Sequence, residues 1–305
     1  MPERRSALVR LPESDRWTYG GYPYGVEPLV LPPAGAAADD AHPPVPHELA
    51  RAETLLTRLE ADAREMPTGP ARAGGVDLAR FRWITGHQIC FVLWRLLAEV
   101  EPTGPHPLTA DQVRTARICL DAYSAMLLYT GSCTREVYLA DVRPSMAHQH
   151  PSFSGSWAPD YHPVRQLLRG RAGPLAHVDD VAGALWENQR VHDAVAAWLV
   201  HGGPSLLRQA QLGRVEPELS RLLFDAYFVT ARQPVPGWDI AVQLLRRALA
   251  VAADLRENAL YRPEDERAAR PDAWWDGATV AGLVAAAARC VIEPVAARAC
   301  QLTTR

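Results

Sequence analysis

A helical stripe that contains a histidine constrains the fold of this chain more than any other feature. Residues 81–100 read Phe-Arg-Trp-Ile-Thr-Gly-His-Gln-Ile-Cys-Phe-Val-Leu-Trp-Arg-Leu-Leu-Ala-Glu-Val. The positions that recur every three or four residues are Trp83, His87, Cys90, Trp94 and Leu97. This spacing predicts one inward-facing side of an α-helix. A buried imidazole needs a hydrogen-bond partner or a function, so His87 is a candidate site residue as well as a candidate core residue.

The same helical periodicity runs through most of the chain. Further helices are expected over residues 47–66, 109–128, 178–200, 217–230, 238–259 and 276–302. Thr109, followed three positions later by Gln112, has the pattern of a capping box at the start of a helix. Extended alternation is scarce, and no β-α-β pattern occurs. The sequence therefore predicts an all-α fold, a bundle of long antiparallel helices.

Two local expectations concern polar positions. Arg95 and Glu99 lie four residues apart on another face of the first helix, where we expect them to pair in water. Residues 133–162 are rich in Pro, Ser, Gly and His, and this composition predicts a long loop.

The chain divides into an N-terminal part, residues 1–46, and a helical domain, residues 47–305. Segment 16–31 has no clear periodicity and is expected to be an extended arm; its aromatic residues are Trp17, Tyr19, Tyr22 and Tyr24. Segment 32–46 is rich in Pro and Ala and has the composition of a flexible linker.

Composition argues against several classes of protein. The net charge is -3 and no basic stripe is present, which argues against nucleic acid as the main partner. Five widely spaced cysteines without a Cys-x-x-Cys pair, and no apolar segment near residue 1, predict free thiols in the cytoplasm. The longest apolar run, 280–295, is interrupted by Arg289, Glu293 and Pro294, so we expect it to be too short and too charged to span a membrane.

Common catalytic patterns are missing. The sequence has no glycine-rich phosphate loop, no Gly-x-Ser-x-Gly, no His-Glu-x-x-His and no Glu-x-x-His di-iron pattern. His148, His150 and His162, near Asp160, form a conceivable metal site, but histidines in loops are usually solvated, so we do not favour one here.

His87 and His192 differ from the other histidines because each is predicted to lie on the apolar stripe of a long helix. Two such helices around a flat cofactor would place one imidazole as an axial iron ligand and the other above the open face, as in a haem pocket. Periodicity alone leaves open the alternative that both are hydrogen-bonded core residues.

Three ordered motifs carry a family resemblance. The stretch Trp83-Ile-Thr-Gly-His87-Gln-Ile-Cys-Phe-Val-Leu-Trp94-Arg-Leu-Leu-Ala-Glu resembles the helix Phe-Ile-x-x-His-Gln-x-x-Glu-Leu-Trp-x-x-x-Leu-x-Glu of the tryptophan 2,3-dioxygenase superfamily. The arm Thr18-Tyr19-Gly20-Gly21-Tyr22 is similar to the Thr-Tyr-Gly-x-Tyr-Leu segment that reaches into a neighbouring subunit there. Arg190-Val191-His192 lies where the superfamily's proximal Arg-x-His is expected.

The resemblance implies roles for these residues. His192 would be the proximal haem ligand, and His87, with a pKa near neutrality, the distal histidine that moves a proton. Trp83 would line the substrate pocket, together with Tyr19 and Tyr22 from a partner subunit, which implies a homodimer or a larger homo-oligomer.

Departures from the superfamily pattern narrow the comparison. The Phe-Arg that holds the substrate carboxylate has a loose counterpart in Val142-Arg143, and the Gly-Thr-Gly-Gly loop is reduced to His201-Gly-Gly-Pro204. These changes are similar to the haem-dependent aromatic oxygenase branch, especially the L-tyrosine 3-hydroxylases of natural-product pathways. That branch implies hydroxylation of L-tyrosine to L-DOPA with hydrogen peroxide. A relative that acts on 3-methyltyrosine has a cysteine shortly after a histidine for a covalent haem link; no His-x-x-x-Cys occurs here, so we expect non-covalent haem b.

Two other functions stay open on the sequence. One is a tryptophan or substituted-indole oxygenase that uses molecular oxygen. The other is a non-enzymatic helical binding protein in which both histidines are core residues.

Overall fold

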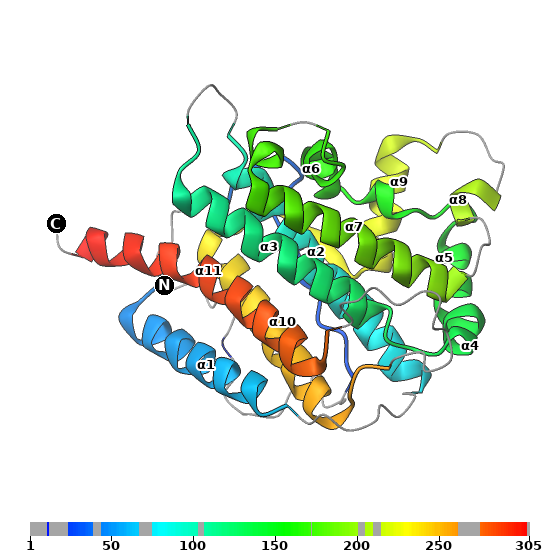
Figure 1. Cartoon of the computed structure of the whole chain (residues 1–305), viewed down its shortest axis with the longest axis horizontal. Helices are drawn as coiled ribbons and strands as arrows, with labels where there is room; N and C mark the ends of the chain where they lie inside the picture. The colour runs from blue at the N-terminus through cyan, green and yellow to red at the C-terminus, as the bar shows by residue number, and fades with distance from the viewer. Residues whose placement is uncertain are drawn as a thin grey trace.

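The computed structural model describes residues 11, 24–38, 44–66, 75–102, 107–171, 173–200, 205–209, 215–261 and 275–303. The fold is essentially all-α, which confirms the predicted fold class (Figure 1). The long helices are α1 (Pro46–Arg64), α2 (Val76–Val100), α3 (Ala110–Thr130), α7 (Asp179–Val200), α10 (Gly237–Glu257) and α11 (Gly277–Thr303). The shorter ones include α8 (Leu206–Gln209) and α9 (Pro217–Tyr227).

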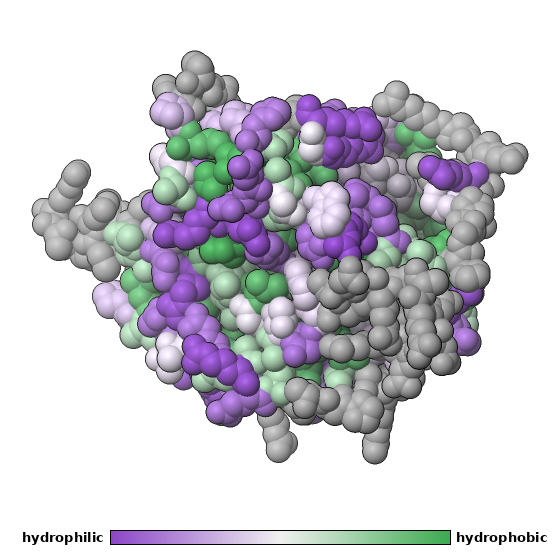
Figure 2. Space-filling model, in the orientation of Figure 1, coloured by the Kyte–Doolittle hydropathy of each residue, from purple (hydrophilic) through white to green (hydrophobic). Residues whose placement is uncertain are grey.

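Helix α3 occupies the middle of the bundle. It packs against α2, α7 and α11, while α11 also packs against α1 and α10. The predicted capping box starts α3 as expected, because the Thr109 hydroxyl accepts a hydrogen bond from the Gln112 backbone N–H and the Gln112 side chain accepts one from the Thr109 backbone N–H. Hydrophilic residues cover much of the outer face over α3 and α7, and apolar residues show between the helices (Figure 2). The helices are therefore amphipathic, as the periodicity indicates.

Helix α2 is covered on more sides than its sequence indicates. Arg95 is buried, and its guanidinium donates to Asp160 at 3.2 Å and to the Ala36 carbonyl at 2.6 Å. The prediction that Arg95 pairs with Glu99 in solvent was wrong. The segment around Ala36 and the start of α6 (Tyr161–Leu168) cover this face of the helix.

The predicted long loop over residues 133–162 was also wrong. It contains α4 (Arg135–Val137), the π-helical turn η2 (Tyr138–Val142), α5 (Arg143–Gln149) and the 3₁₀ turn η3 (Gly155–Trp157). Pro144 lies in the first turn of α5, where its missing N–H and fixed φ suit a helix start. The buried positions Tyr138, Val142 and Met146 are four residues apart, a helical spacing that the prolines and glycines obscured.

A short parallel ladder joins a segment before α1 to the segment between α9 and α10. Strand β1 (Leu29–Leu31) pairs with β2 (Thr230–Arg232), with Val30 opposite Ala231. The helix expected to reach Thr230 ends at Tyr227, and Val229 has a φ of 50°, the left-handed conformation that often follows a helix. Three-residue strands are too short to show alternation, so the sequence did not reveal them.

Helix α11 contains a longer apolar segment than the sequence analysis predicted. Its segment Gly277–Ala297 is long and apolar enough to cross a membrane by length and composition, so the expectation that it is too short was wrong. Of its most apolar window, 44% is buried inside the protein, where α11 packs on α1, α3 and α10. Arg289 of this helix forms ion pairs with Glu53 and Glu60 of α1. These contacts favour a packed helix of the bundle.

A buried ion pair fixes the first half of α2. The Arg82 guanidinium contacts the Asp254 carboxylate at 2.7 Å, and the two side chains are 2% and 1% exposed. We expect Arg82→Met to lower the free energy of unfolding by about 3–5 kcal/mol, because it leaves a buried carboxylate without its cation. Arg114→Met, which breaks an exposed pair with Asp111, should cost less than about 1 kcal/mol. If urea unfolding gives the same loss of unfolding free energy for the two variants, the buried pair stabilises the fold no more than the exposed pair.

Candidate functional site

A cavity of about 540 Å³ is enclosed mainly by α2, α3 and α7, with contributions from α5, α6 and α9. Its volume and predominantly apolar walls are typical of a small-molecule or cofactor site. Four residues predicted from the sequence line this one cavity: Trp83, His87, Arg143 and His192. The other two predicted site residues, Tyr19 and Tyr22, lie outside the described residues.

Close packing along α3 sets the two histidine-bearing helices beside the cavity. A β-carbon at Gly86 would collide with the Thr130 side chain, and one at Gly131 would lie 2.6 Å from Val195. Glycine at both positions therefore lets α2 and α7 approach α3 closely. His87 follows Gly86 directly, so this contact fixes the position from which the imidazole enters the cavity.

The His87 ring is held by one hydrogen bond and two aromatic contacts. Nδ1 lies 2.6 Å from the Trp83 carbonyl oxygen, so in the neutral tautomer Nδ1–H donates and Nε2 keeps its lone pair. The ring stacks on Phe228 at 4.8 Å and 28°, and it contacts the Trp83 ring at 4.4 Å. The hypothesis of a hydrogen-bonded core histidine is therefore met in part, but the ring also faces the cavity.

Burial lowers the pKa of His87 to about 4, and the hydrogen bond to the Trp83 carbonyl raises it only in part. The expectation of a near-neutral pKa was wrong, because the surrounding Trp83, Phe228 and Cys90 side chains bring no negative charge to offset desolvation. The imidazole is therefore neutral at pH 7.

The depressed pKa of His87 predicts a pH dependence of stability. Between pH 6.5 and 4 the unfolded chain binds a proton at His87 that the folded chain does not, so stability falls as the pH falls through this window. The expected loss is about 3 kcal/mol in the free energy of unfolding. Urea unfolding of the haem-free protein and of His87→Gln at pH 7 and pH 4 measures it, and the variant should lack this component. The same pH dependence in both proteins would exclude a lowered pKa.

His192 lines the same cavity but is not buried. Its side chain is 54% exposed, and its Nδ1 lies 3.3 Å from a carboxylate oxygen of Asp193. The expectation that His192 lies on the buried stripe was wrong, because the stripe that α7 buries is formed by Val181, Ala184, Leu185, Asn188, Val191, Val195 and Leu199. One residue beyond Val191, the helix has turned by about 100°, so His192 lies outside the buried stripe. A carboxylate beside Nδ1 orients an imidazole and leaves Nε2 for an external ligand.

Arg143 brings a cation to the cavity wall. Burial raises the pKa of the Tyr138 hydroxyl, and a hydrogen bond and the positive charge from Arg143 lower it in part. The Tyr138 ring also contacts the Trp83 ring at 5.8 Å. A guanidinium has five N–H donors, so Arg143 can hold Tyr138 and still bind a carboxylate.

Residues 34–184 match the family model described as SfmD 3-methyl-L-tyrosine peroxygenase. The match spans slightly less than half of the chain and shows what this part of it is similar to. Curated proteins gave no match to the chain. The matched residues include Trp83, His87 and Arg143, whereas His192 and Phe228 lie beyond them.

Aromatic side chains that sequence reasoning did not single out complete the wall of the cavity. Phe153, from the region predicted as a loop, stacks on Phe224 at 5.6 Å and 9°, and Phe224 lies 4.7 Å from Phe228. All three line the cavity. The signal for Phe224 and Phe228 was their four-residue spacing at the end of a predicted helix. Nothing in the sequence indicated that Phe153 joins them, because only the fold brings η3 to α9.

The loop-histidine metal site that we did not favour has no support in the described residues. Asp160 is paired with Arg95 and with Arg232, and His150 Nδ1 accepts a hydrogen bond from the Ser152 backbone N–H. No group of three or more His, Cys, Asp or Glu side chains able to hold a metal ion occurs in the described part of the chain. Haem iron, in contrast, needs a single protein nitrogen.

Proposed function

We propose that this protein is a haem-dependent peroxygenase that hydroxylates the ring of L-tyrosine to L-DOPA with hydrogen peroxide. The observation that carries the proposal is that one apolar cavity receives an imidazole from α2 and another from α7. The match to a haem-dependent family that acts on a tyrosine analogue supports it.

The residues of the cavity fit a haem. His192 would hold the iron through Nε2, because its side chain is 54% exposed and its Nδ1 lies beside Asp193. The predominantly apolar walls suit a porphyrin, and Arg143 and Arg169, which line the cavity, would pair with carboxylates. Burial raises the pKa of the Cys90 thiol, so it stays protonated and does not compete as an anionic ligand. We retain the proposal of haem b bound without a covalent link.

When bound, the haem supplies the iron that activates peroxide for transfer of one oxygen atom to the substrate ring. In the overall reaction, L-tyrosine and hydrogen peroxide give L-DOPA and water. His87 would accept the peroxide proton at Nε2 and return it to the oxygen that leaves as water. Its lowered pKa keeps Nε2 unprotonated at neutral pH, so the base is ready before peroxide arrives.

Substrate orientation is assigned to the walls of the cavity. Arg143 would bind the amino-acid carboxylate, and Trp83 would limit which ring can lie beside the iron. Tyr19 and Tyr22 would enter from a partner subunit of a homodimer, as the family resemblance implies. We also propose a cytoplasmic location, which the free thiols of the described Cys90, Cys119, Cys133 and Cys290 support.

Product analysis tests the proposed function against its alternatives. The haem-reconstituted protein is incubated with L-tyrosine, 3-methyl-L-tyrosine or L-tryptophan, each with hydrogen peroxide or with molecular oxygen and a reductant. L-DOPA from L-tyrosine and peroxide is the expected product. Turnover of 3-methyl-L-tyrosine alone would retain the peroxygenase and correct the substrate. Oxygen-dependent turnover of L-tryptophan would replace the proposal with an indole oxygenase, and a folded protein without turnover of any substrate would favour a binding protein.

A further inference from the structure

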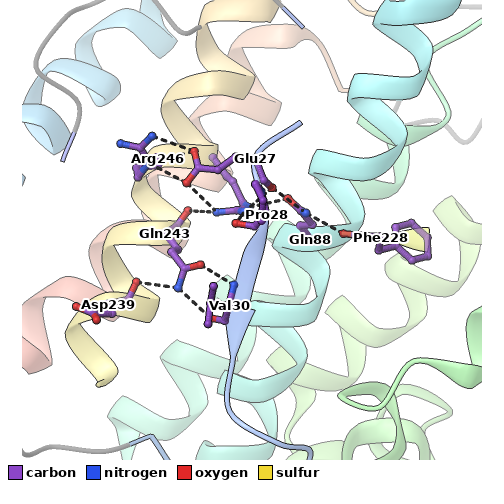
Figure 3. Close-up of polar contacts among 9 residues, drawn as sticks. Glu27, Pro28, Val30, Gln88, Phe228, Asp239, Gln243 and Arg246 are labelled. Atoms are coloured by element: carbon purple, nitrogen blue, oxygen red, sulfur yellow. Dashed lines mark hydrogen bonds and ion pairs between the residues drawn. The ribbon is translucent and has the colours of Figure 1, made fainter. Parts of the chain in front are cut away.

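A buried polar network begins at Gln88, the residue of α2 that follows His87. It connects α2, α10 and residues 27–30, the last two of which begin β1 (Figure 3). Its centre is Gln88, the residue after His87, which is 1% exposed. Of the residues in this network only Phe228 lines the cavity, so the proposed chemistry does not account for the others.

The Gln88 carboxamide makes three hydrogen bonds. Its Nε2 donates to the Glu27 carbonyl at 3.1 Å and to the Phe228 carbonyl at 2.9 Å. Its Oε1 accepts from Nε of Arg247 at 2.8 Å. Both N–H groups and the oxygen of one side chain are thus used, which fixes the orientation of the amide.

Two arginines of α10 hold the Glu27 end of the network. Arg246 binds the Glu27 carboxylate through Nε at 2.9 Å and Nη2 at 3.0 Å. Arg247 donates through Nη2 to the carbonyls of Glu27 and Pro28, both at 3.0 Å. The N-terminal segment is therefore bound through its backbone as well as its carboxylate, and its position is tied to Gln88.

Gln243 makes an equivalent clamp without contact to Phe228. Its Oε1 accepts from the Val30 N–H at 2.7 Å, and its Nε2 donates to the carbonyls of Val30 and Asp239. It is 0% exposed. Gln243 and Gln88 thus hold the same N-terminal segment with the same chemical group at the same depth, but only Gln88 reaches the residue that stacks on His87.

We propose that Gln88 is a positioning residue that holds the Phe228 ring against the His87 imidazole and links this stack to the N-terminal segment. The Phe228 carbonyl is fixed by Gln88, and a second, weaker contact comes from the Thr230 hydroxyl at 3.2 Å. Phe228 follows the last residue of α9, where the backbone is not held by helix hydrogen bonds on both sides. The catalytic meaning of this link rests on the proposed function, because it assumes that His87 handles a proton.

The N-terminal arm and the wall of the cavity are both bound by Gln88. Residues 27–30 reach Gln88 and Arg247 through backbone carbonyls, so seating this segment and placing Phe228 against His87 use the same carboxamide. A change in the position of the segment therefore reaches the cavity wall through the Gln88 side chain, beside the backbone hydrogen bond from the Leu29 N–H to the Val229 carbonyl.

Substituting glutamate for each glutamine tests the proposal. Gln88→Glu keeps the oxygen that accepts from Arg247 but replaces the NH₂ group that donates to Glu27 and Phe228. The matched control, Gln243→Glu, makes the identical change in the other clamp. The measurement is the NMR spectrum of the haem-free protein labelled at histidine. The ring C–H signals of His87 are assigned by their absence from the spectrum of His87→Gln. Phe228→Leu gives the position of these signals without the stacked ring.

We expect Gln88→Glu to move the His87 signals downfield toward their position in Phe228→Leu, whereas Gln243→Glu leaves them in place. Unchanged signals in Gln88→Glu, or equal movement in the two variants, would overturn the proposal. Gln88→Asn, which keeps the carboxamide but shortens it by one methylene, replaces Gln88→Glu if that variant does not fold, and it should cause the same displacement.

Activity separates this proposal from the proposed function. If the wild-type holoenzyme oxidises no aromatic amino acid while the His87 signals respond as expected, the proposed function fails and the positioning role stands. If the wild type is active, Gln88→Glu should lower kcat more than it raises KM, because the proton-handling group is displaced while the Arg143 wall is unchanged.

Discussion

His192→Ala should abolish stoichiometric haem binding. The substitution removes an imidazole that is 54% exposed, whereas the His87 ring on α2 is held by the Trp83 carbonyl and stacks on Phe228. In a titration of the purified chain with haem, we expect the Soret band to fall more than tenfold at equal protein and haem concentration. The fold should survive, because a half-exposed side chain contributes little to stability.

Two controls separate loss of the ligand from loss of the pocket. His148→Ala removes an exposed histidine of α5 that does not line the cavity, and it should bind haem like the wild type. Imidazole added to His192→Ala should restore part of the Soret band by filling the space left by the side chain. Wild-type haem affinity and spectrum in His192→Ala would assign the iron to another residue.

His87→Ala should keep the haem but lose most of the turnover with peroxide. Removing a general acid–base group typically lowers the rate by a factor of about 10²–10⁴, and we expect kcat for tyrosine hydroxylation to fall within this range. KM for L-tyrosine should change less, because Arg143 and Trp83 are untouched. Stopped-flow mixing of the ferric protein with peroxide and steady-state product formation measure the two effects.

The control for His87 lies one turn further along the same wall. Cys90→Ala also alters a cavity-lining side chain of α2, but its protonated thiol has no part in proton transfer, so turnover should stay close to that of the wild type. Full turnover in His87→Ala would remove His87 from the catalytic role, whatever its place in the cavity.

The long helices could be predicted from the sequence because each one buries a stripe with helical spacing. The predicted capping box at Thr109 and the start of α2 within its apolar pattern both rest on local rules that the fold did not override. Residues 133–162 were mistaken for a loop because proline was read as a helix breaker, whereas Pro144 lies in the first turn of a helix.

The sequence predicted which residues line the cavity better than it predicted how buried each of them is. A helical stripe tells which side chains share a face, but it does not tell what covers that face, so His192 was expected to be buried and is half exposed. The prediction for Arg95 was wrong in the opposite sense: Arg95 was expected to be exposed and is buried. A loop segment 59 residues away in sequence and Asp160 cover it. Gln88 and Phe228 meet only through tertiary structure, and the sequence carries no local sign of their contact.

A haem titration of the purified wild-type chain tests the proposed pocket most directly. We expect a Soret band that saturates at one haem per chain and shifts when L-tyrosine is added, because the substrate would lie beside the iron between Trp83 and Arg143. A folded chain whose spectrum shows no saturable Soret band would contradict a haem site between α2 and α7.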